Sequence, residues 1–171
     1  IAEVGAGVAH LTASAAAFGF SVGSLASVAR GPAAWLTAKP SGVTFSQACT
    51  LPIVWSTAHS AFGSSLIGAR RRLLVHASAG GVGLVSVEYA TWLSADVYGS
   101  AGMPFKHRSI TDVRRCSSRS GGAFATGTLR LLQRCRLHGA LNSLSSDFIP
   151  VTFALLAEGA ELDEIGKRHI W

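Results

Sequence analysis

Residues 73–83 of the chain read Leu73-Leu74-Val75-His76-Ala77-Ser78-Ala79-Gly80-Gly81-Val82-Gly83. An apolar run typical of a buried strand leads into a turn of small residues, and a helical pattern follows directly. Ala77, Gly80 and Gly83 occupy the three positions of the dinucleotide-binding fingerprint, in the variant with alanine first. Small residues there allow a tight turn and a close backbone approach to a diphosphate. The helix N-terminus then offers N–H groups and the positive end of its dipole to the phosphates.

The alternative interpretation is a glycine turn that serves packing only. Against it, a strand precedes the turn, a helix follows it, and a second strand is expected at residues 95–99, as a dinucleotide site requires. That strand ends Val97-Tyr98-Gly99-Ser100-Ala101-Gly102, without the Asp or Glu that usually holds the ribose of NAD. Lys106, His107 and Arg108 follow shortly. Missing negative charge with nearby positive charge favours a 2′-phosphate, and therefore NADPH, over the alternative that Lys106 is a solvated loop lysine.

The rest of the C-terminal part alternates between strands and helices. Apolar residues Val82, Val85, Tyr89 and Trp92 recur at spacings of three and four after the turn, which predicts an amphipathic helix. Further strands are predicted at 113–117, 137–142 and 160–166, and helices at 124–133 and 148–157. Such alternation predicts an α/β fold, a Rossmann-like doubly wound parallel sheet with helices on both faces.

The N-terminal part is rich in Gly, Ala and Ser, with short β-like pieces. Strands are predicted at 1–4, 18–22, 25–29 and 35–39, too few to close a barrel. Thr44 with Gln47 forms a capping-box pattern for a helix at 45–51, which Pro52 ends, and a second helix is predicted at 53–66. We expect residues 1–45 to be a remnant of a β-rich domain and residues 46–171 a dinucleotide-binding domain, with the chain incomplete at both ends.

Composition narrows the function classes. Hydrophobic residues make up 49% of the 171 and charged residues 14%, with a formal net charge of +6. No nucleic-acid motif with interleaved aromatics is present, so we expect no nucleic-acid partner. The run from Ala13 to Ala29 is too poor in Leu and Ile for a membrane span. Cys49, Cys116 and Cys135 lack metal-ligand spacing, so we expect no bound metal. Their odd number and wide separation favour reduced, buried thiols in a cytoplasmic protein.

Several segments together resemble one family. They are Thr50-Leu51-Pro52 with Thr57-Ala58, the turn at 75–83, Lys106-His107, Ser117-Ser118-Arg119, Leu141-Asn142-Ser143-Leu144-Ser145 and Glu164-Ile165-Gly166-Lys167. These resemble the enoyl reductase domain of polyketide synthases, within the medium-chain reductase superfamily. The resemblance is sharp from about Pro40 onward and looser before it, where it implies a partial GroES-like segment.

The resemblance implies a reaction and a partner. NADPH would deliver hydride to the β-carbon of an enoyl thioester on an acyl carrier protein, without a metal, beside neighbouring synthase domains. Carried over position by position, the diphosphate would be held by Ala77, Ser78, Ala79, Gly80, Gly81, Val82 and Gly83. Lys106, Ser118 and Arg119 would lie near the 2′-phosphate, and Asn142, Ser143 and Leu144 near the nicotinamide ribose. Lys167 would donate a proton, with positioning or simple exposure as the rival interpretations.

The chain also departs from the family. The upstream segment that normally covers the nicotinamide is not in these residues, and Leu11–Ala15 replaces an expected Gly-Asp turn. We therefore expect NADPH binding without turnover from these 171 residues. The alternatives are a free-standing quinone or enone reductase and a catalytically inactive fragment with a structural or docking role. His76 and the tryptophans Trp35, Trp55 and Trp92 are expected to be ordinary core residues.

Overall fold

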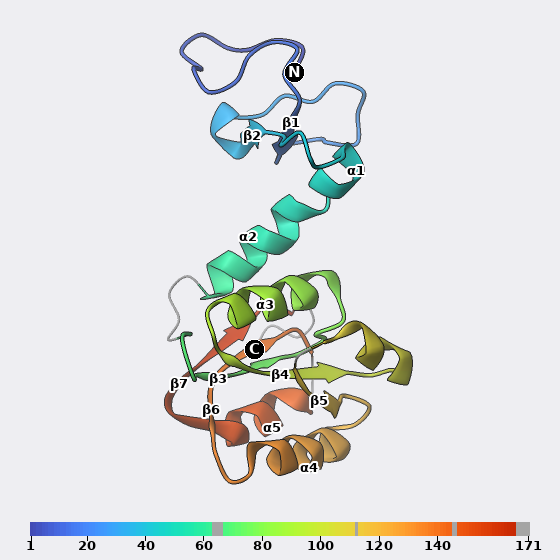
Figure 1. The fold of residues 1–171 in the computed structure, drawn as a ribbon, viewed down its shortest axis with the longest axis vertical. Coiled ribbons are helices and arrows are strands. Elements are labelled where there is room, and N and C mark those ends of the chain that lie inside the picture. Colours follow the sequence, from blue (N-terminus) through green and yellow to red (C-terminus); the bar gives the residue numbers. More distant parts are fainter. Residues whose placement is uncertain (63–66, 112, 145–146, 167–171) are drawn as a thin grey trace. The chain divides into compact units, whose positions relative to one another are not determined.

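A computed structural model describes residues 1–62, 67–111, 113–144 and 147–166 of the chain (Figure 1). The chain divides into two compact units, residues 1–54 and 55–171. Helix α2, Leu51–Phe62, contains the boundary between them. Each unit is described by itself below.

The C-terminal unit is built on a five-stranded parallel sheet. Its strands lie in the order β5-β4-β3-β6-β7. Their bounds are β3 Arg72–Val75, β4 Asp96–Ala101, β5 Arg114–Ser117, β6 Leu137–Asn142 and β7 Leu156–Glu164. Helix α3, Gly81–Trp92, lies on one face, and α4, Gly121–Leu132, and α5, Phe148–Leu155, lie on the other (Figure 1). This confirms the predicted doubly wound α/β fold.

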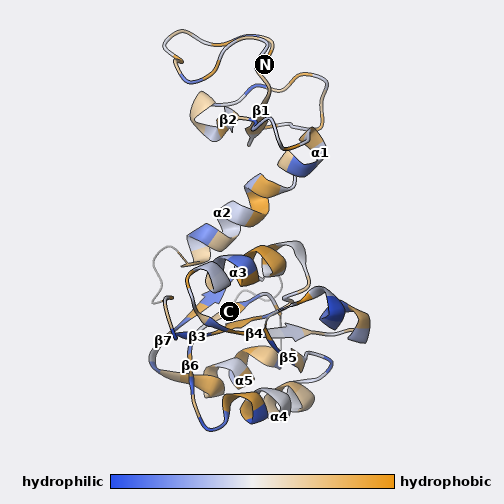
Figure 2. Ribbon diagram, viewed as in Figure 1, coloured by the Kyte–Doolittle hydropathy of each residue, from blue (hydrophilic) through white to orange (hydrophobic). Residues whose placement is uncertain are grey.

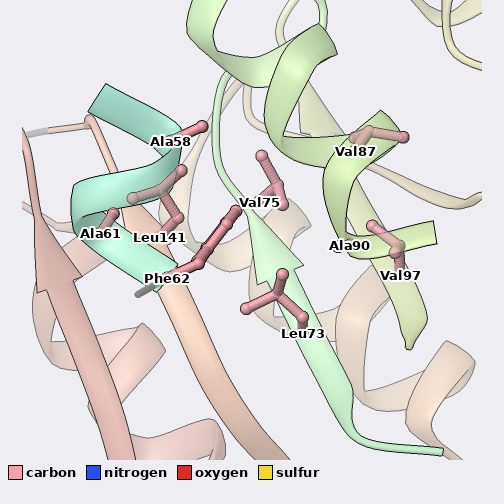
Figure 3. Packing of buried hydrophobic residues seen from close by; sticks show 9 residues of the cluster. All are labelled: Ala58, Ala61, Phe62, Leu73, Val75, Val87, Ala90, Val97 and Leu141. Atoms are coloured by element: carbon pink, nitrogen blue, oxygen red, sulfur yellow. The ribbon is translucent and has the colours of Figure 1, made fainter. Parts of the chain in front are cut away.

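Two apolar clusters hold the layers together. On one face, Leu73 and Val75 of β3 pack with Val87 and Ala90 of α3 and with Phe62 of α2 (Figure 3). The second cluster lies between the sheet and helices α4 and α5; its buried members are Leu74, Tyr98, Cys116, Phe124, Leu132, Leu137, Ala140 and Leu155. Hydrophobic and hydrophilic residues both occur along α3 and α4 (Figure 2), as expected for helices that cover one face of a sheet.

The strand order creates a switch point beside β3. From β3 the chain moves outward through β4 to β5, and α4 then returns it to β6 on the other side of β3. Val75 is paired with Gly99 of β4 and with Leu141 of β6. The connections that leave β3 and β6 therefore depart in opposite directions, which makes the carboxyl ends of these strands the switch point, where α/β sheets usually bind ligands.

Helix and strand ends differ from the predicted ones for local reasons. Helix α4 begins at Gly121 because the Ser120 hydroxyl caps it, accepting from Ala123 N at 3.3 Å. Strand β7 begins at Leu156, and Gly159 with φ +71° lies in it beside a register shift against β6. Pro52 does not end a helix; it lies in the first turn of α2, where proline needs no N–H partner.

The buried face of α3 also differs from the predicted stripe. Gly83, Ser86, Val87 and Ala90 are buried, while Val82, Val85 and Tyr89 pack at the margin of the core. The expectation that Trp92 lies in the core is wrong, since it is 75% exposed. Small residues face the sheet because α3 packs unusually close to β3.

The N-terminal unit holds fewer strands than predicted. Strand β1, Ala17–Gly19, pairs antiparallel with β2, Leu36–Ala38, which follows a 3₁₀ turn η1 at Ala33–Trp35. The predicted strands at 1–4 and 25–29 are not formed; Leu25 is fully exposed, and no neighbouring strand pairs with either segment among the described residues. Helix α1, Phe45–Ala48, has the predicted capping box of Thr44 and Gln47.

Two further expectations concern single residue types. Trp35 is half exposed, so its assignment to the core is wrong, as is the expected burial of Cys49 and Cys135. Only Cys116 of the three free thiols is buried. Within the described residues, no helix is long and apolar enough to cross a membrane, and no group of three metal-ligating side chains occurs.

Candidate functional site: the carboxyl edge of the sheet

The glycine turn lies at the carboxyl end of β3 and opens onto solvent. Ala77 has φ +46°, a left-handed conformation that turns the chain sharply after the strand. Gly80 is the N-cap of α3, and both Gly80 and Gly81 are exposed. The first turn of a twelve-residue helix therefore presents its N–H groups at the switch point of the sheet.

Gly83 is the residue that lets the helix approach the turn. A Cβ at this position would lie 2.4 Å from the Ala77 carbonyl oxygen and 2.6 Å from the Ser78 Cα. Both are backbone atoms and cannot move aside. Gly80 is less constrained, with a 3.3 Å approach to the same oxygen. The third glycine of the fingerprint is thus required for packing, as the sequence pattern predicts.

The turn is anchored to β4 through one serine carbonyl. The Ser100 carbonyl oxygen accepts from Ser78 N at 2.9 Å and from Ser78 Oγ at 3.0 Å. A Cβ on Gly99 would lie only 2.7 Å from Ser78 Oγ, so a larger residue there would displace Ser78. Sequence reasoning missed Gly99 and Ser100 as parts of the site. A glycine inside a buried strand was the available signal, because it marks a close approach.

His76 joins three elements behind the turn. Its Nδ1 is 3.0 Å from Ser100 Oγ, and its Nε2 is 2.9 Å from Thr152 Oγ1 on α5. The Thr152 hydroxyl donates to Phe148 O at 2.6 Å, so it accepts from Nε2–H, and Nδ1 accepts from Ser100. Burial lowers the pKa of His76 to about 4, which keeps the ring neutral. The expectation of a packed, hydrogen-bonded histidine is confirmed.

The segment after β4 carries cations and no acid among its described residues. Residues 99–102 end the strand without a carboxylate, and Lys106 and Arg108 lie exposed on the 3₁₀ turn η2, Pro104–Ser109. Arg119 Nε donates to Gly102 O at 2.6 Å, so its guanidinium lies against the end of β4. The backbone N–H of Ser118 donates to Ala101 O at 3.1 Å. Lys106, Ser118 and Arg119 therefore come from two segments that meet at the end of β4.

The end of β6 lies on the other side of the switch point from β4. Asn142 is fully buried; its Nδ2 donates to Leu144 O at 2.8 Å and to the Glu164 carboxylate. Ser143 Oγ lies 3.5 Å from His76 O, which brings this strand end next to the glycine turn. Asn142, Ser143 and Leu144 thus occupy the predicted edge. Lys167 lies outside the described residues.

A cavity of about 440 Å³ lies beside the end of β7. Hydroxyls of Ser56, Thr57 and Ser60 on α2 line it, together with the carboxylates Asp163 and Glu164. Burial, and then the neighbouring Glu161, raises the pKa of Asp163. Because Glu164 also contacts Asn142, the cavity borders the residues predicted to lie near the nicotinamide ribose.

Comparison with known proteins places this arrangement among synthase domains. No protein-family model matches the chain. It is 30% identical over 138 residues, 77% of the chain, to the highly reducing polyketide synthase apmlA of Arthrinium phaeospermum. It is 29% identical over 175 residues, 99% of the chain, to the pikromycin polyketide synthase component PikAII of Streptomyces venezuelae. The chain spans only 6% and 5% of the lengths of these two synthases.

Solved structures agree with the sequence relatives. The CurK enoyl reductase is 32% identical, with a TM-score of 0.76 over 82% of this chain and 43% of that one. A structure assigned as an enoyl reductase domain of a polyketide synthase is 31% identical, with a TM-score of 0.62 over 70% of each chain. The nucleotide-binding subdomain of the PpsC enoylreductase domain from Mycobacterium tuberculosis is 29% identical, with a TM-score of 0.64 over 70% of this chain and 68% of that one. Mycobacterial Rv1454c, complexed with NADPH, shares the fold at 24% identity and a TM-score of 0.84 over 95% of this chain and 53% of that one.

Proposed function

Since this chain belongs to the enoyl reductase domains of polyketide synthases, in the medium-chain dehydrogenase/reductase and quinone oxidoreductase superfamily, we propose that it contributes the NADPH-binding part of an enoyl reductase. The reaction would be reduction of an α,β-unsaturated thioester carried on an acyl carrier protein. The observation that carries the proposal is the exposed first turn of α3, reached through a turn that only small residues fit, at the switch point of a parallel sheet.

The residues of the turn fit a diphosphate. The first turn of α3 has N–H groups without carbonyl partners in the helix, and its dipole favours an anion by about 0.3–1 kcal/mol. Gly80 and Gly81 place no side chain between the backbone and a ligand. Relatives support the assignment, because Rv1454c forms a complex with NADPH and the PpsC fragment is a nucleotide-binding subdomain. Ala77–Gly83 would hold the diphosphate.

Cations beyond β4 would select the phosphorylated cofactor. Lys106 is exposed and Arg119 lies against Gly102, so both can reach a dianion at the end of β4, and no described carboxylate at 99–102 would repel it. A charge-assisted contact contributes about 1.5–3 kcal/mol. Lys106→Ala should therefore weaken NADPH binding about 10–100-fold and leave NADH nearly unchanged, as measured by calorimetric titration of both cofactors.

A matched variant sharpens this titration. Arg30→Ala removes one exposed arginine from the other unit and should alter neither dissociation constant. Equal losses for NADPH and NADH in Lys106→Ala would show that Lys106 does not contact the 2′-phosphate. No binding of either nucleotide by the unmodified chain would favour a fragment that keeps the fold for structure or docking.

NADPH supplies hydride when bound, and this chain would supply the walls around the reacting end. Asn142, fixed by Leu144 and Glu164, would border the nicotinamide ribose together with Ser143 and Leu144. Ser56, Thr57 and Ser60 of α2 and Asp163 line the adjacent cavity, and their polar groups would face the bound cofactor or the thioester. Lys167 would donate the proton to the α-carbon, as the family resemblance implies.

The acyl carrier protein and the neighbouring synthase domains complete the proposal. We propose that residues 1–45 belong to the β-rich substrate domain and that the remaining residues form the nucleotide-binding domain. Thioester reduction would then need more of the synthase than this chain. The test is an NADPH-oxidation assay with crotonyl-pantetheine and the purified 171-residue chain, for which we expect cofactor binding without turnover.

A further inference from the structure

The edge of the sheet opposite the glycine turn carries most of the chain's excess positive charge. We name as the basic edge the turns that lead into β3, β4 and β6, the last turns of α3 and α4, and the first three residues of β3, β4, β6 and β7. Two carboxylates, Asp96 and Glu158, lie there, so the basic edge has a net charge of +4 out of the chain's +6. Its arginines come from the turn before β3 and from the end of α4 and the turn that follows; they are Arg70, Arg71, Arg72, Arg130, Arg134 and Arg136.

The structure holds part of this charge in fixed positions. Arg72 Nε donates to Arg136 O at 2.6 Å, and Arg136 donates to the Ala154 carbonyl. Arg72 Nη2 lies 3.2 Å from His138 Nε2. Burial, and then the charges of Arg72 and Arg71, lower the pKa of His138. The guanidinium groups are thus oriented by carbonyl oxygens and an imidazole, and the cations remain close enough to repel further positive charge.

An exposed aromatic ring lies beside the arginines. Trp92, at the end of α3, is 75% exposed and stacks on Tyr89 with ring centroids 5.9 Å apart. Tyr89 in turn stacks on Phe62 at 6.0 Å, so the three rings pack in one series. The turn after Trp92 is joined to the arginines because Arg70 N donates to Ser94 O at 3.0 Å. An exposed aromatic side chain that already packs on another ring loses less entropy on binding than one without such a contact.

We propose that the basic edge, with Trp92 as its aromatic anchor, is a docking surface for an acidic segment of another domain of the synthase. Trp, Tyr and Arg are the residue types most enriched in binding hot spots between proteins. The chain spans 5–6% of its curated synthase relatives, so those polypeptides contain many further segments that could supply an acidic partner. A nucleic acid fits less well, since Arg72 and Arg136 already donate to carbonyl oxygens and the same surface carries the exposed carboxylates Asp96 and Glu158, which would repel phosphates.

The partner contacts a different edge from the nucleotide, which makes this proposal independent of the proposed function. The probe is a fluorescein-labelled helical peptide of about 20 residues, long enough to hold a helix, with Glu on one face and Leu at its centre. Its matched control has Gln in place of Glu, and a short DNA duplex is the competing probe. Fluorescence anisotropy measures binding to the 171-residue chain in low salt and at about 0.15 M salt.

We expect saturable binding of the Glu peptide that weakens with salt and is at least about tenfold tighter than binding of the Gln peptide or the duplex. Trp92→Ala and the double change Arg70→Glu/Arg71→Glu should each weaken it about tenfold or more. The control Arg30→Glu/Arg108→Glu makes the same charge change elsewhere and should leave it within about twofold. Absence of saturable binding, tighter binding of the duplex, or equal effects of the two double variants would each overturn the proposal.

Discussion

Acidification should destabilise this fold through one buried ring. His76 is 2% exposed, and burial lowers its pKa from 6.5 to about 4. Below about pH 6.5 the unfolded chain therefore binds a proton at this position that the folded chain does not bind. The free energy of unfolding consequently falls as the pH drops from about 6.5 to about 4, and the contribution is present in full only above about 6.5.

The magnitude follows from the two pKa values. Each pKa unit corresponds to about 1.4 kcal/mol, so the loss between about pH 7 and pH 4 is about 3 kcal/mol. That is a large share of the ~5–15 kcal/mol that typically separates folded and unfolded states. The cost has a structural cause, because a protonated ring would place its charge in a buried position where water cannot solvate it.

Urea denaturation at a series of pH values measures this loss. The matched variant His76→Gln keeps an acceptor and a donor but does not titrate, and should be about 1–2 kcal/mol less stable at neutral pH. Its stability should depend less on pH than that of the unmodified chain, so the two curves should cross between about pH 6 and pH 5, and below the crossing the unmodified chain should be the less stable of the two. Taking the difference between the curves cancels the contributions of Asp163 and His138, whose pKa values also shift.

Two results would refute the reasoning. Parallel curves for the two proteins would mean that the His76 ring does not resist protonation in the folded state. A direct titration of its Cε1–H resonance by NMR that gave an ordinary value, near about 6.5, would refute it as well.

Three further substitutions test the local geometry. Gly83→Ala should destabilise the fold by about 2–3 kcal/mol and abolish NADPH binding, since the added Cβ would lie 2.4 Å from the Ala77 carbonyl oxygen. An unchanged stability in urea would show that the close approach of α3 to the turn is not needed. Gln133→Gly should stabilise it by about 1 kcal/mol, because Gln133 ends α4 with φ +49°, and a drop in melting temperature would argue against strain there. Asn142→Leu should lower the free energy of unfolding by about 2 kcal/mol, because it leaves the Leu144 carbonyl and the Glu164 carboxylate without their amide donor. Urea denaturation measures this change, and a neutral effect would mean that these hydrogen bonds contribute little.

The sequence determined the fold class and the place of the glycine turn. Alternation of apolar runs with helical periodicity predicts the parallel sheet, and each predicted strand from residue 72 onward is formed, with ends moved by a few residues. The capping box of Thr44 and Gln47 is equally local and forms as predicted. These features depend on spacing along the chain, which the sequence contains in full.

Tertiary structure alone decided which side chains surround the turn. His76, Ser100 and Thr152 are separated by up to 76 residues along the chain, and no spacing rule brings them together. No spacing rule predicts the contact of Asn142 with Glu164 either, or that of Arg119 with the end of β4.

The sequence predicted the burial of apolar side chains least well where no other helix or strand covers them. Trp92 follows the apolar spacing of α3 but is mostly exposed, and the segment 25–29 has strand-like residues without a neighbouring strand among the described residues. An apolar residue is buried only where another element covers it, and which element does so is set by packing of segments distant in sequence.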